Sequence, residues 1–264
     1  MTYALELQNA ALSLGGKQLW SGLNLQVKPG EFVAVIGSNG SGKTSLLKAI
    51  LGQLPLTAGK VLIGSKPALR GGKSIGYIPQ HRSLDQAGNL LAKDLVQLGL
   101  DGTKFGIPVS SPVVRRKVKH TLEQIGASEL ANLSVSELSG GQLQRLRVGQ
   151  AVISEPKLLL ADEPLSALDL HQQKLISELI NEEHKRTKAA VLFVTHDVNP
   201  ILEMVDRVLY LANGHFRIGT PDEVLRSEVL SELYGTQVDV VRNQGRIVVV
   251  GTHEHDHHPD EQWA

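Results

Sequence analysis

The sequence predicts an α/β fold, and three features of the chain support this prediction. A glycine-rich loop connects an apolar strand at residues 32–36 to a helix at residues 45–51. Two more apolar runs, 158–161 and 190–194, have the length of buried strands and end at polar residues. Between about 86 and 137 helical spacing replaces these runs, which indicates a helical insertion on a sheet-containing body.

The composition fits a globular chain that carries no disulfides. The 264 residues suit one large or two small domains, and 41% of them are hydrophobic, which is enough for a core. Lys+Arg and Asp+Glu both number 27, so the basic excess typical of nucleic-acid-binding proteins is missing. The lack of cysteine excludes a disulfide framework and a thiolate metal site.

No part of the sequence predicts a membrane span or a signal peptide. No apolar run approaches the roughly 18–20 residues of a transmembrane helix. The first residues lack a basic segment followed by an apolar one. We therefore expect a cytosolic chain that reaches a membrane only through a partner.

The glycine-rich loop has the sequence context of a phosphate-binding loop. Its glycines allow several backbone N–H groups to point into one small space, and the following helix N-terminus adds partial positive charge there. Lys43 is expected to reach the β- and γ-phosphates, and the Thr44 hydroxyl to ligate Mg²⁺. The alternative is a turn that only caps a helix. The match at every fixed position, and in the flanking strand and helix, favours the phosphate loop. The predicted loop residues are Gly37, Ser38, Asn39, Gly40, Ser41, Gly42, Lys43 and Thr44.

Two adjacent carboxylates, Asp162 and Glu163, follow the strand at 158–161. Such a pair at a strand end is costly unless a cation or a transferable proton is present. Asp162 fits as a Mg²⁺ ligand, and Glu163 fits as the base or aligner of an attacking water. The alternative is an exposed loop pair, and the nearby phosphate loop favours the functional interpretation.

Three further sites carry weaker signals when each is taken alone. Gln80 ends a short strand, and a loop amide is the simpler interpretation. Residues 139–142 open a helix and could expose N–H groups to an anion, but capping by Ser139 is the simpler interpretation. His196 lies at the carboxyl end of the strand at 190–194, where α/β sheets place ligands, and could bond a γ-phosphate. The other histidines of the body, His184 among them, are expected at the surface.

The remaining chain alternates strands, helices and turns, with Asn213-Gly214 as a strong hairpin signal. The other predicted strands are 3–8, 22–28, 60–63, 75–80, 208–211, 215–218, 238–241 and 247–250, and the other helices are 113–125, 138–153, 170–185 and 222–234.

The chain ends in a histidine-rich segment. Residues 253–258 combine imidazoles and carboxylates, which suit Zn²⁺ or Ni²⁺. No rigid site is implied, so the affinity would be modest and pH-dependent. An inert polar tail or part of a purification tag are the alternatives, and they stay open here.

In combination, these motifs resemble the ATP-binding-cassette (ABC) ATPases in order and spacing over residues 3–235. The resemblance implies a core sheet that carries the phosphate loop, an antiparallel β subdomain, and a helical subdomain at about 86–150. A C-terminal β-hairpin at 236–250 and a histidine-rich tail at 251–264, expected to be disordered, would follow it.

The resemblance also implies a role for each motif. Residues 37–44 resemble the Walker A loop, and 158–163 resemble the Walker B strand with its catalytic glutamate, Glu163. Gln80 resembles the glutamine that contacts Mg²⁺ and couples to a transmembrane partner. His196 resembles the switch histidine. The implied ligands are ATP and Mg²⁺, and the catalytic residues are Glu163, His196 and Gln80.

Residues 138–142 resemble the signature motif, which in the family acts on the ATP held by the other subunit. Asp169 resembles the aspartate of the D-loop. One cassette in one chain therefore implies a homodimer with two ATP molecules sandwiched head to tail. The implied nucleotide contacts outside the loop are Ser139, Gly140, Gly141, Gln142 and Asp169, and the implied metal ligands are Thr44, Gln80 and Asp162.

The sequence departs from the family pattern at three places. Leu14 stands near the position of an aromatic that commonly stacks on adenine. Gly149-Gln150-Ala151 replaces a common Ala-Arg-Ala, and Leu165 replaces a common threonine.

The segments 94–100 and 162–172, the final hairpin and the tail are similar to those of bacterial zinc importers. The resemblance implies a transmembrane permease, a solute-binding protein and a place at the cytoplasmic face of the membrane. Siderophore and haem importers share the pattern at 168–172 and are the first alternative. A soluble cassette of translation or DNA repair is the second, although such proteins usually carry two cassettes or long coiled coils.

Overall fold

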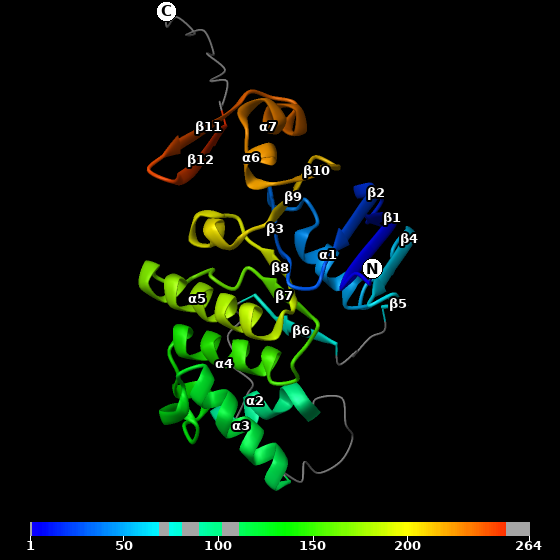
Figure 1. Cartoon of the computed structure of the whole chain (residues 1–264). Coiled ribbons are helices and arrows are strands. Elements are labelled where there is room, and N and C mark those ends of the chain that lie inside the picture. Colours follow the sequence, from blue (N-terminus) through cyan, green and yellow to red (C-terminus); the bar gives the residue numbers. More distant parts are fainter. Residues whose placement is uncertain (1, 69–73, 81–89, 102–110, 252–264) are drawn as a thin grey trace, which may run out of the picture.

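The centre of the molecule is a six-stranded sheet with the strand order β10-β9-β3-β8-β7-β6 (Figure 1). The computed structural model describes residues 2–68, 74–80, 90–101 and 111–251. All pairings in this sheet are parallel except that of β10 with β9. The strands are β3 (Phe32–Gly37), β6 (Ile75–Ile78), β7 (Leu158–Asp162), β8 (Ala190–Val194), β9 (Arg207–Ala212) and β10 (His215–Gly219).

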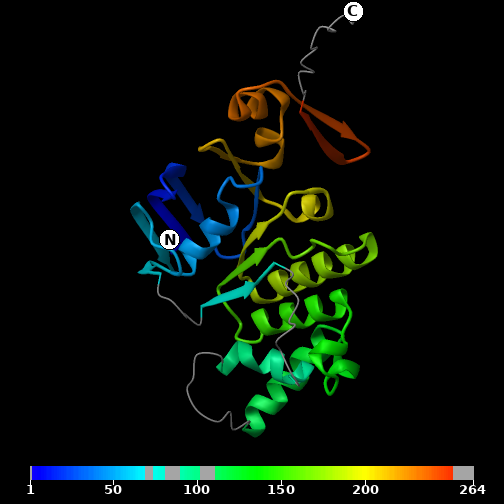
Figure 2. The same cartoon turned by 180° about the vertical axis from the view of Figure 1, so that it is seen from behind.

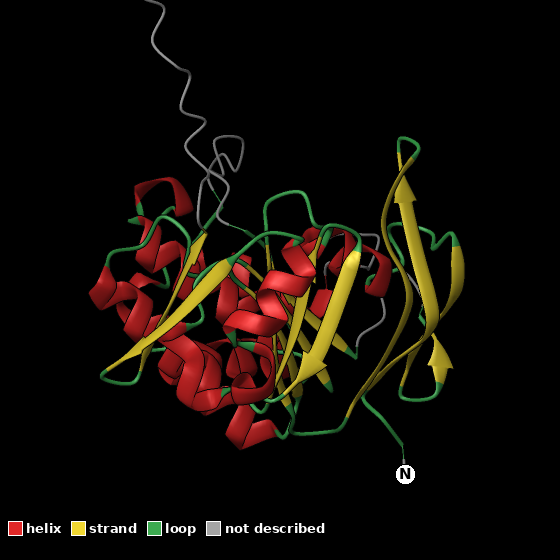
Figure 3. Ribbon diagram, turned by 90° about the horizontal axis from the view of Figure 1, so that it is seen from above, coloured by secondary structure: helices red, strands yellow, loops and turns green. Residues whose placement is uncertain are grey.

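A second sheet is antiparallel, has the order β2-β1-β4-β5 and lies to one side of the first (Figures 1 and 3). Its first strand runs well beyond the predicted end at residue 8. The register of β1 with β2 shifts between Leu7 and Ala10, and Asn9 adopts a positive φ of 46°. This bulge breaks the alternation on which the prediction rested. The strands are β1 (Leu5–Leu14), β2 (Lys17–Val27), β4 (Ala58–Ile63) and β5 (Lys66–Pro67).

The helices fall into groups around the sheets. α1 follows the glycine-rich loop, whereas α2, α3 and α4 lie at the end of the molecule opposite to α6 and α7 (Figures 1 and 2). We call residues 92–152 the helical subdomain. The helices are α1 (Lys43–Ile50), α2 (Ala92–Asp101), α3 (Pro112–Gln124), α4 (Gly140–Val152), α5 (Leu170–Thr187), α6 (Pro221–Val224) and α7 (Ser227–Tyr234), with 3₁₀ turns η1 (Ser128–Leu130), η2 (Val135–Glu137) and η3 (Asn199–Met204).

The central sheet separates two hydrophobic cores. On β3, Phe32 and Ala34 face a core shared with the helical subdomain and α5, whereas Val33 and Val35 face a core shared with α1 and the antiparallel sheet. All four side chains are 0% exposed. Because both faces of the sheet are buried, the sequences of β3 and β8 are continuous apolar runs. The structure confirms the predicted α/β class.

The sheet order brings the predicted functional segments together. β3, β8, β7 and β6 are parallel neighbours, so their carboxyl ends meet at one edge. Residue 37 ends β3 and begins the glycine-rich loop, Asp162 ends β7, and His196 follows β8 by two residues. This edge is where open parallel sheets bind their ligands.

The predicted helix at 222–234 is wrong as a single element, because α6 ends at Val224 and α7 begins at Ser227. Val224, Leu225, Leu230 and Leu233 are all buried. In one straight helix of 3.6 residues per turn, Val224 would face away from Leu233. The break at 225–226 allows all four side chains to reach the core.

His184 is not a surface residue: it is half-buried, its Nδ1 lies 2.8 Å from the carbonyl oxygen of Ala189, and its ring meets Phe32 edge-on. The start of the helical insertion at 86 and nearly all of the histidine-rich tail lie outside the described residues.

The last described element is a hairpin of β11 (Val238–Asn243) and β12 (Arg246–Gly251). Its turn residues Gln244 and Gly245 both have positive φ, as a two-residue type I′ turn requires. Val238 and Ile247 are buried on the inner face of the hairpin. We call β11 and β12 the C-terminal hairpin.

Gly99 allows α2 to pack closely on α4. A Cβ atom at position 99 would lie 2.0 Å from the carbonyl oxygen of Gln150 and 2.6 Å from Cγ2 of Ile153. Replacing a helical glycine by alanine ordinarily stabilises a protein by about 0.5–1 kcal/mol. We expect Gly99→Ala to have the opposite sign and to destabilise the chain by about 1–3 kcal/mol in urea unfolding, because the helices must separate. A stabilised variant would contradict the close packing.

Candidate functional site

The glycine-rich loop is shaped by three glycines with positive φ. Gly37, Gly40 and Gly42 have φ values of 151°, 76° and 96°. A Cβ atom on Gly37 would lie 1.9 Å from the carbonyl oxygen of Leu211, and one on Gly42 would lie 2.9 Å from Nε1 of Trp20. Positions 37 and 42 therefore require glycine both for the backbone conformation and for space, whereas position 40 favours it for the backbone conformation alone.

Lys43 lies inside the curl of this loop. Its Nζ donates hydrogen bonds to the carbonyl oxygens of Gly37 at 2.8 Å and Ser38 at 3.0 Å. Burial lowers the pKa of Lys43, while the negative charges of Glu163 and Asp162 oppose that shift. The ammonium group is thus held at the loop and faces the carboxylates across the site.

Asp162 is the buried centre of the site, with 2% of its surface exposed. Its Oδ1 accepts a hydrogen bond of 3.1 Å from the Thr44 hydroxyl, and its Oδ2 accepts one of 3.4 Å from the Tyr77 hydroxyl. Burial raises the pKa of Asp162, and the bond from Thr44 opposes the rise. A hydroxyl beside a carboxylate is an oxygen donor set that suits Mg²⁺.

Glu163 adopts a positive φ of 45°, which is unusual for a residue other than glycine. Its N–H donates to Val194 O at 3.0 Å, and the hydroxyl of Ser166 donates to its carbonyl oxygen at 2.9 Å. These bonds fix a strained backbone at the end of β7, as is common in functional sites.

The Glu163 carboxylate faces two of the other predicted residues. Gln80 Nε2 donates to Glu163 Oε2 at 3.2 Å, and His196 Nδ1 lies 3.9 Å from the same oxygen. The structure therefore brings Gln80, Glu163 and His196 into one cluster, next to the loop and Asp162. We call this group the carboxyl-edge site.

Residues 139–142 form a different cluster. Ser139 caps α4: its Oγ accepts from the Gln142 N–H at 3.3 Å, and its own N–H donates to Gln142 Oε1 at 2.9 Å. Asp169 similarly caps α5 through a 2.8 Å bond from the Gln172 N–H. A Cβ atom on Gly141 would lie 2.3 Å from Gln172 Oε1, so α4 and α5 begin in close contact.

This second cluster lies at the start of α4 and α5, apart from the loop that precedes α1 (Figures 1 and 2). The structure of one chain therefore does not bring residues 139–142 to the phosphate loop. Both capping roles are local, and they leave the exposed helix starts free to meet another molecule.

The loop has the polar groups that a triphosphate and Mg²⁺ need. Ser41 Oγ is buried and has no hydrogen-bond partner among the described residues. The helix N-terminus, the Lys43 ammonium and the Thr44 hydroxyl face the same edge as Asp162. The donors suit phosphate oxygens and the Thr44–Asp162 pair suits the metal, so the residues present fit both groups.

The structure explains two of the three departures from the family pattern. Leu165 is 5% exposed and contributes to the core. A Cβ atom on Gly149 would lie 2.6 Å from Ile125 Cδ1, so glycine lets α4 pack against this residue. Leu14 is 41% exposed at the end of β1, and it offers an accessible apolar side chain rather than an aromatic ring.

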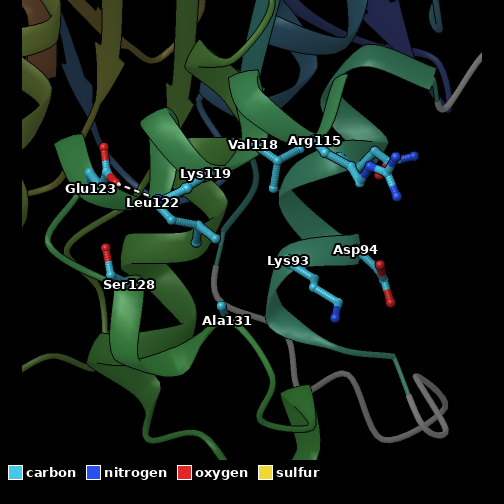
Figure 4. Close-up of a pocket in the computed structure, with 10 residues that line it drawn as sticks. Lys93, Asp94, Arg115, Val118, Lys119, Leu122, Glu123, Ser128 and Ala131 are labelled. Carbon is cyan, nitrogen blue, oxygen red and sulfur yellow. Dashed lines mark ion pairs between the residues drawn. The ribbon is translucent and has the colours of Figure 1, made fainter. Parts of the chain in front are cut away.

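A cavity of about 480 Å³ lies elsewhere, between α2 and α3 (Figure 4). Val118 and Leu122 line its apolar wall, and Lys119 pairs with Glu123 at 3.9 Å beside them. None of the predicted site residues lines it. Its size alone does not make it the reactive site, because the converging carboxylates, hydroxyls and lysine lie at the carboxyl-edge site.

Sequence reasoning missed two polar residues of the carboxyl-edge site. Tyr77 contacts Asp162 from β6, and Ser166 fixes the Glu163 backbone. Tyr77 could have been found, because it lies one residue before the end of a strand whose carboxyl end was expected near β7. Ser166 gave no signal, since a serine in a turn is ordinary.

Comparison with known proteins identifies the family to which this chain is similar. A family model of ABC transporters matches residues 20–166, which is more than half of the chain. The zinc import ATP-binding protein ZnuC of Chelativorans sp. (strain BNC1) is 35% identical over 96% of this chain and 81% of its own length. The sulfate/thiosulfate import ATP-binding protein CysA of Photorhabdus laumondii is 34% identical over 84% of this chain but only 62% of its own length.

Solved structures agree at the level of the fold and the family. An inward-facing structure described as a metal-chelate type ABC transporter is 27% identical, with a TM-score of 0.80 over 96% of this chain and 98% of its own. The cbiO1 protein of Clostridium perfringens, part of the ABC transporter complex cbiONQ, is 26% identical with a TM-score of 0.74, over 88% of this chain and 94% of its own. With the geometry of the carboxyl-edge site, these matches show that the chain belongs to the ABC transporter family and is an ATP-binding ATPase.

Proposed function

We propose that this ATPase powers the import of a metal ion, zinc, through a membrane permease. The observation that carries the proposal is the extent of the match to proteins named for zinc import. Four such relatives are 31–36% identical over 85–100% of this chain. The CysA relatives share a similar identity, but this chain covers only 60–64% of their length.

Import of a metal chelate, such as a siderophore or haem, is the second candidate. It is favoured by the metal-chelate type transporter, whose fold matches 96% of this chain. The cassette does not touch the cargo in either case, so the two candidates share one ATPase mechanism and differ only in the permease and the solute-binding protein.

Catalysis at the carboxyl-edge site depends on position and charge. The N–H groups of residues 38–44 and the Lys43 ammonium hold the β- and γ-phosphates of ATP and offset their charge. Thr44, Asp162 and Gln80 would hold Mg²⁺, which would offset negative charge on the phosphate oxygens. Glu163 accepts the proton of the attacking water, and His196 bonds the γ-phosphate.

A second copy of the chain completes the site. Ser139, Gly140, Gly141 and Gln142 contact the ATP held by the other copy, with Asp169 at the same interface. Two features support this arrangement. The residues lie apart from the loop of their own chain, and Ser139 and Asp169 are exposed at the starts of α4 and α5.

A membrane permease is the partner that this function requires, since the relatives are named as import proteins and one solved neighbour is part of a transporter complex. The permease places the ATPase at the cytoplasmic face of the membrane, and a solute-binding protein on the other side delivers the cargo. Within the residues that the structure describes, no helix combines the length and apolarity needed to cross a bilayer.

Lys43→Ala should weaken ATP binding about 10–100-fold, because it removes charge-assisted bonds to phosphate worth about 1.5–3 kcal/mol. Fluorescent-ATP titration of the purified chain measures this. Lys60→Ala, on the exposed strand β4, is the control and should bind normally. Tight binding by Lys43→Ala would contradict the role of the loop.

Glu163→Gln should lower ATP hydrolysis about 10²–10⁴-fold while ATP binding persists, because an amide cannot accept the proton. The variant should then accumulate as a closed dimer with Mg²⁺ and ATP, as read by analytical ultracentrifugation. Glu182→Gln, on the exposed side of α5, should behave as the parent chain. Hydrolysis by Glu163→Gln at the parental rate would show that another group is the base.

Cells that lack the gene for this chain should contain less zinc than parental cells and should fail to grow when a chelator removes zinc from the medium. Added zinc should restore growth, and so should the parent gene but not the Glu163→Gln gene. Elemental analysis of washed cells measures the zinc content. Normal zinc with failure to use haem or a siderophore would instead support the metal-chelate importer and leave the ATPase assignment intact.

A further inference from the structure

The C-terminal hairpin is joined to the loop that carries His196. The hairpin lies beside η3 in both views of the molecule (Figures 1 and 2). Its inner face buries Val238 and Ile247, whereas Val241 and Val248 on its outer face are each 51% exposed. The hairpin is therefore held to the body through its inner face, by core packing of Val238 and Ile247 and by polar bonds.

One side chain, Asn199, makes the polar contact with β12. Its Nδ2 donates to Ile247 O at 2.9 Å, and its Oδ1 accepts from Ile247 N–H at 2.8 Å. The carboxamide thus pairs with both backbone groups of Ile247, as a neighbouring strand would. Only an amide side chain can donate and accept in this way, since a carboxylate lacks the donor.

The same residue also holds the turn that contains His196. Both the N–H and the Nδ2 of Asn199 donate to Asp197 Oδ1, at 2.9 and 2.7 Å. The Thr195 hydroxyl bonds both backbone groups of Asp197. It donates to the carbonyl oxygen at 2.7 Å and accepts from the N–H at 3.1 Å, which closes the turn. Thr195 N–H donates to Val35 O on β3 at 3.1 Å.

His196 is the middle residue of this closed turn. Its side chain is 65% exposed, and its distance of 3.9 Å from Glu163 Oε2 is longer than a hydrogen bond. The imidazole is therefore placed by the turn: Thr195 fixes one side of it to β3, and Asn199 fixes the other side to the C-terminal hairpin.

We propose that Asn199 is a positioning residue for ATP hydrolysis, through which the C-terminal hairpin sets the place of His196 relative to Glu163. This inference rests on the role proposed above for His196. It assigns the hairpin a part in the rate of the reaction, although the hairpin contributes no group to the carboxyl-edge site.

The chain offers a matched control for this contact. The N–H of Val240, on the other strand of the hairpin, donates to Ser227 Oγ on α7 at 2.9 Å. Ser227→Ala therefore also removes a bond that holds the hairpin, but that bond does not lead to His196. Comparing the two variants separates loss of hairpin anchoring in general from loss of the path through Asn199.

The first test is steady-state ATP hydrolysis by the full chain in its transporter complex. We expect Asn199→Ala to lower kcat roughly tenfold with little change in KM, because displacement of a reacting group by even about 1 Å can cost 10²-fold. Ser227→Ala should keep the parental kcat. Equal losses in both variants, or no loss in either, would overturn the proposal.

A double-mutant cycle tests whether the effect passes through His196. Single-turnover hydrolysis is compared for His196→Ala with and without Asn199→Ala. We expect Asn199→Ala to add nothing once the imidazole is gone. A further tenfold loss in that background would show that Asn199 acts by another route. If His196→Ala itself kept the parental rate, the role of His196 would be wrong, and the positioning role would fall with it.

Hydrogen exchange read by mass spectrometry tests the link without any activity. In Asn199→Ala the amides of Asp197 and Ile247 should exchange faster, whereas in Ser227→Ala only that of Val240 should do so. An unchanged Asp197 amide in Asn199→Ala would overturn the link. If these amides exchange faster but His196→Ala keeps the parental rate of hydrolysis, the contact through Asn199 is real and the proposed role of His196 is wrong.

Discussion

The order of the parallel strands is the constraint on which the rest of the structure depends. β3, β8, β7 and β6 are neighbours, so the glycine-rich loop, Asp162, Glu163, Gln80 and His196 meet at one edge although they are far apart in the sequence. Two buried cores, one on each face, hold this order. Asp162 shows the consequence, because a hydroxyl from the loop and one from β6 both reach its carboxylate.

Burial gives this edge its chemistry. Desolvation disfavours both the Lys43 ammonium and the Asp162 carboxylate, and each is offset by groups of the other segment. Such an arrangement gains from a bound polyphosphate and a divalent cation, which provide further opposite charges. The cluster at residues 139–142 lies elsewhere on the chain, at the start of α4, and in our proposal it completes the site between two copies. Asn199 joins the loop of His196 to the C-terminal hairpin.

The sequence predicts the parts of this structure that are local. The strand–loop–helix order around residues 37–44 is visible because glycine spacing and apolar runs are local signals, and Asn213-Gly214 marks its hairpin for the same reason. The contacts of Tyr77 with Asp162 and of Asn199 with Ile247 join residues far apart in the chain, and neither has a sequence pattern. The break between α6 and α7 follows from which residues the core must bury, which depends on packing that a single sequence does not display.

A crystal structure of the chain with Mg²⁺ and a non-hydrolysable ATP analogue tests the central claim most directly. Our account predicts phosphates within the loop at residues 37–44, Mg²⁺ between Thr44 and Asp162, and a second copy whose residues 139–142 contact the γ-phosphate. A nucleotide bound in the cavity between α2 and α3, with the loop empty, would contradict it.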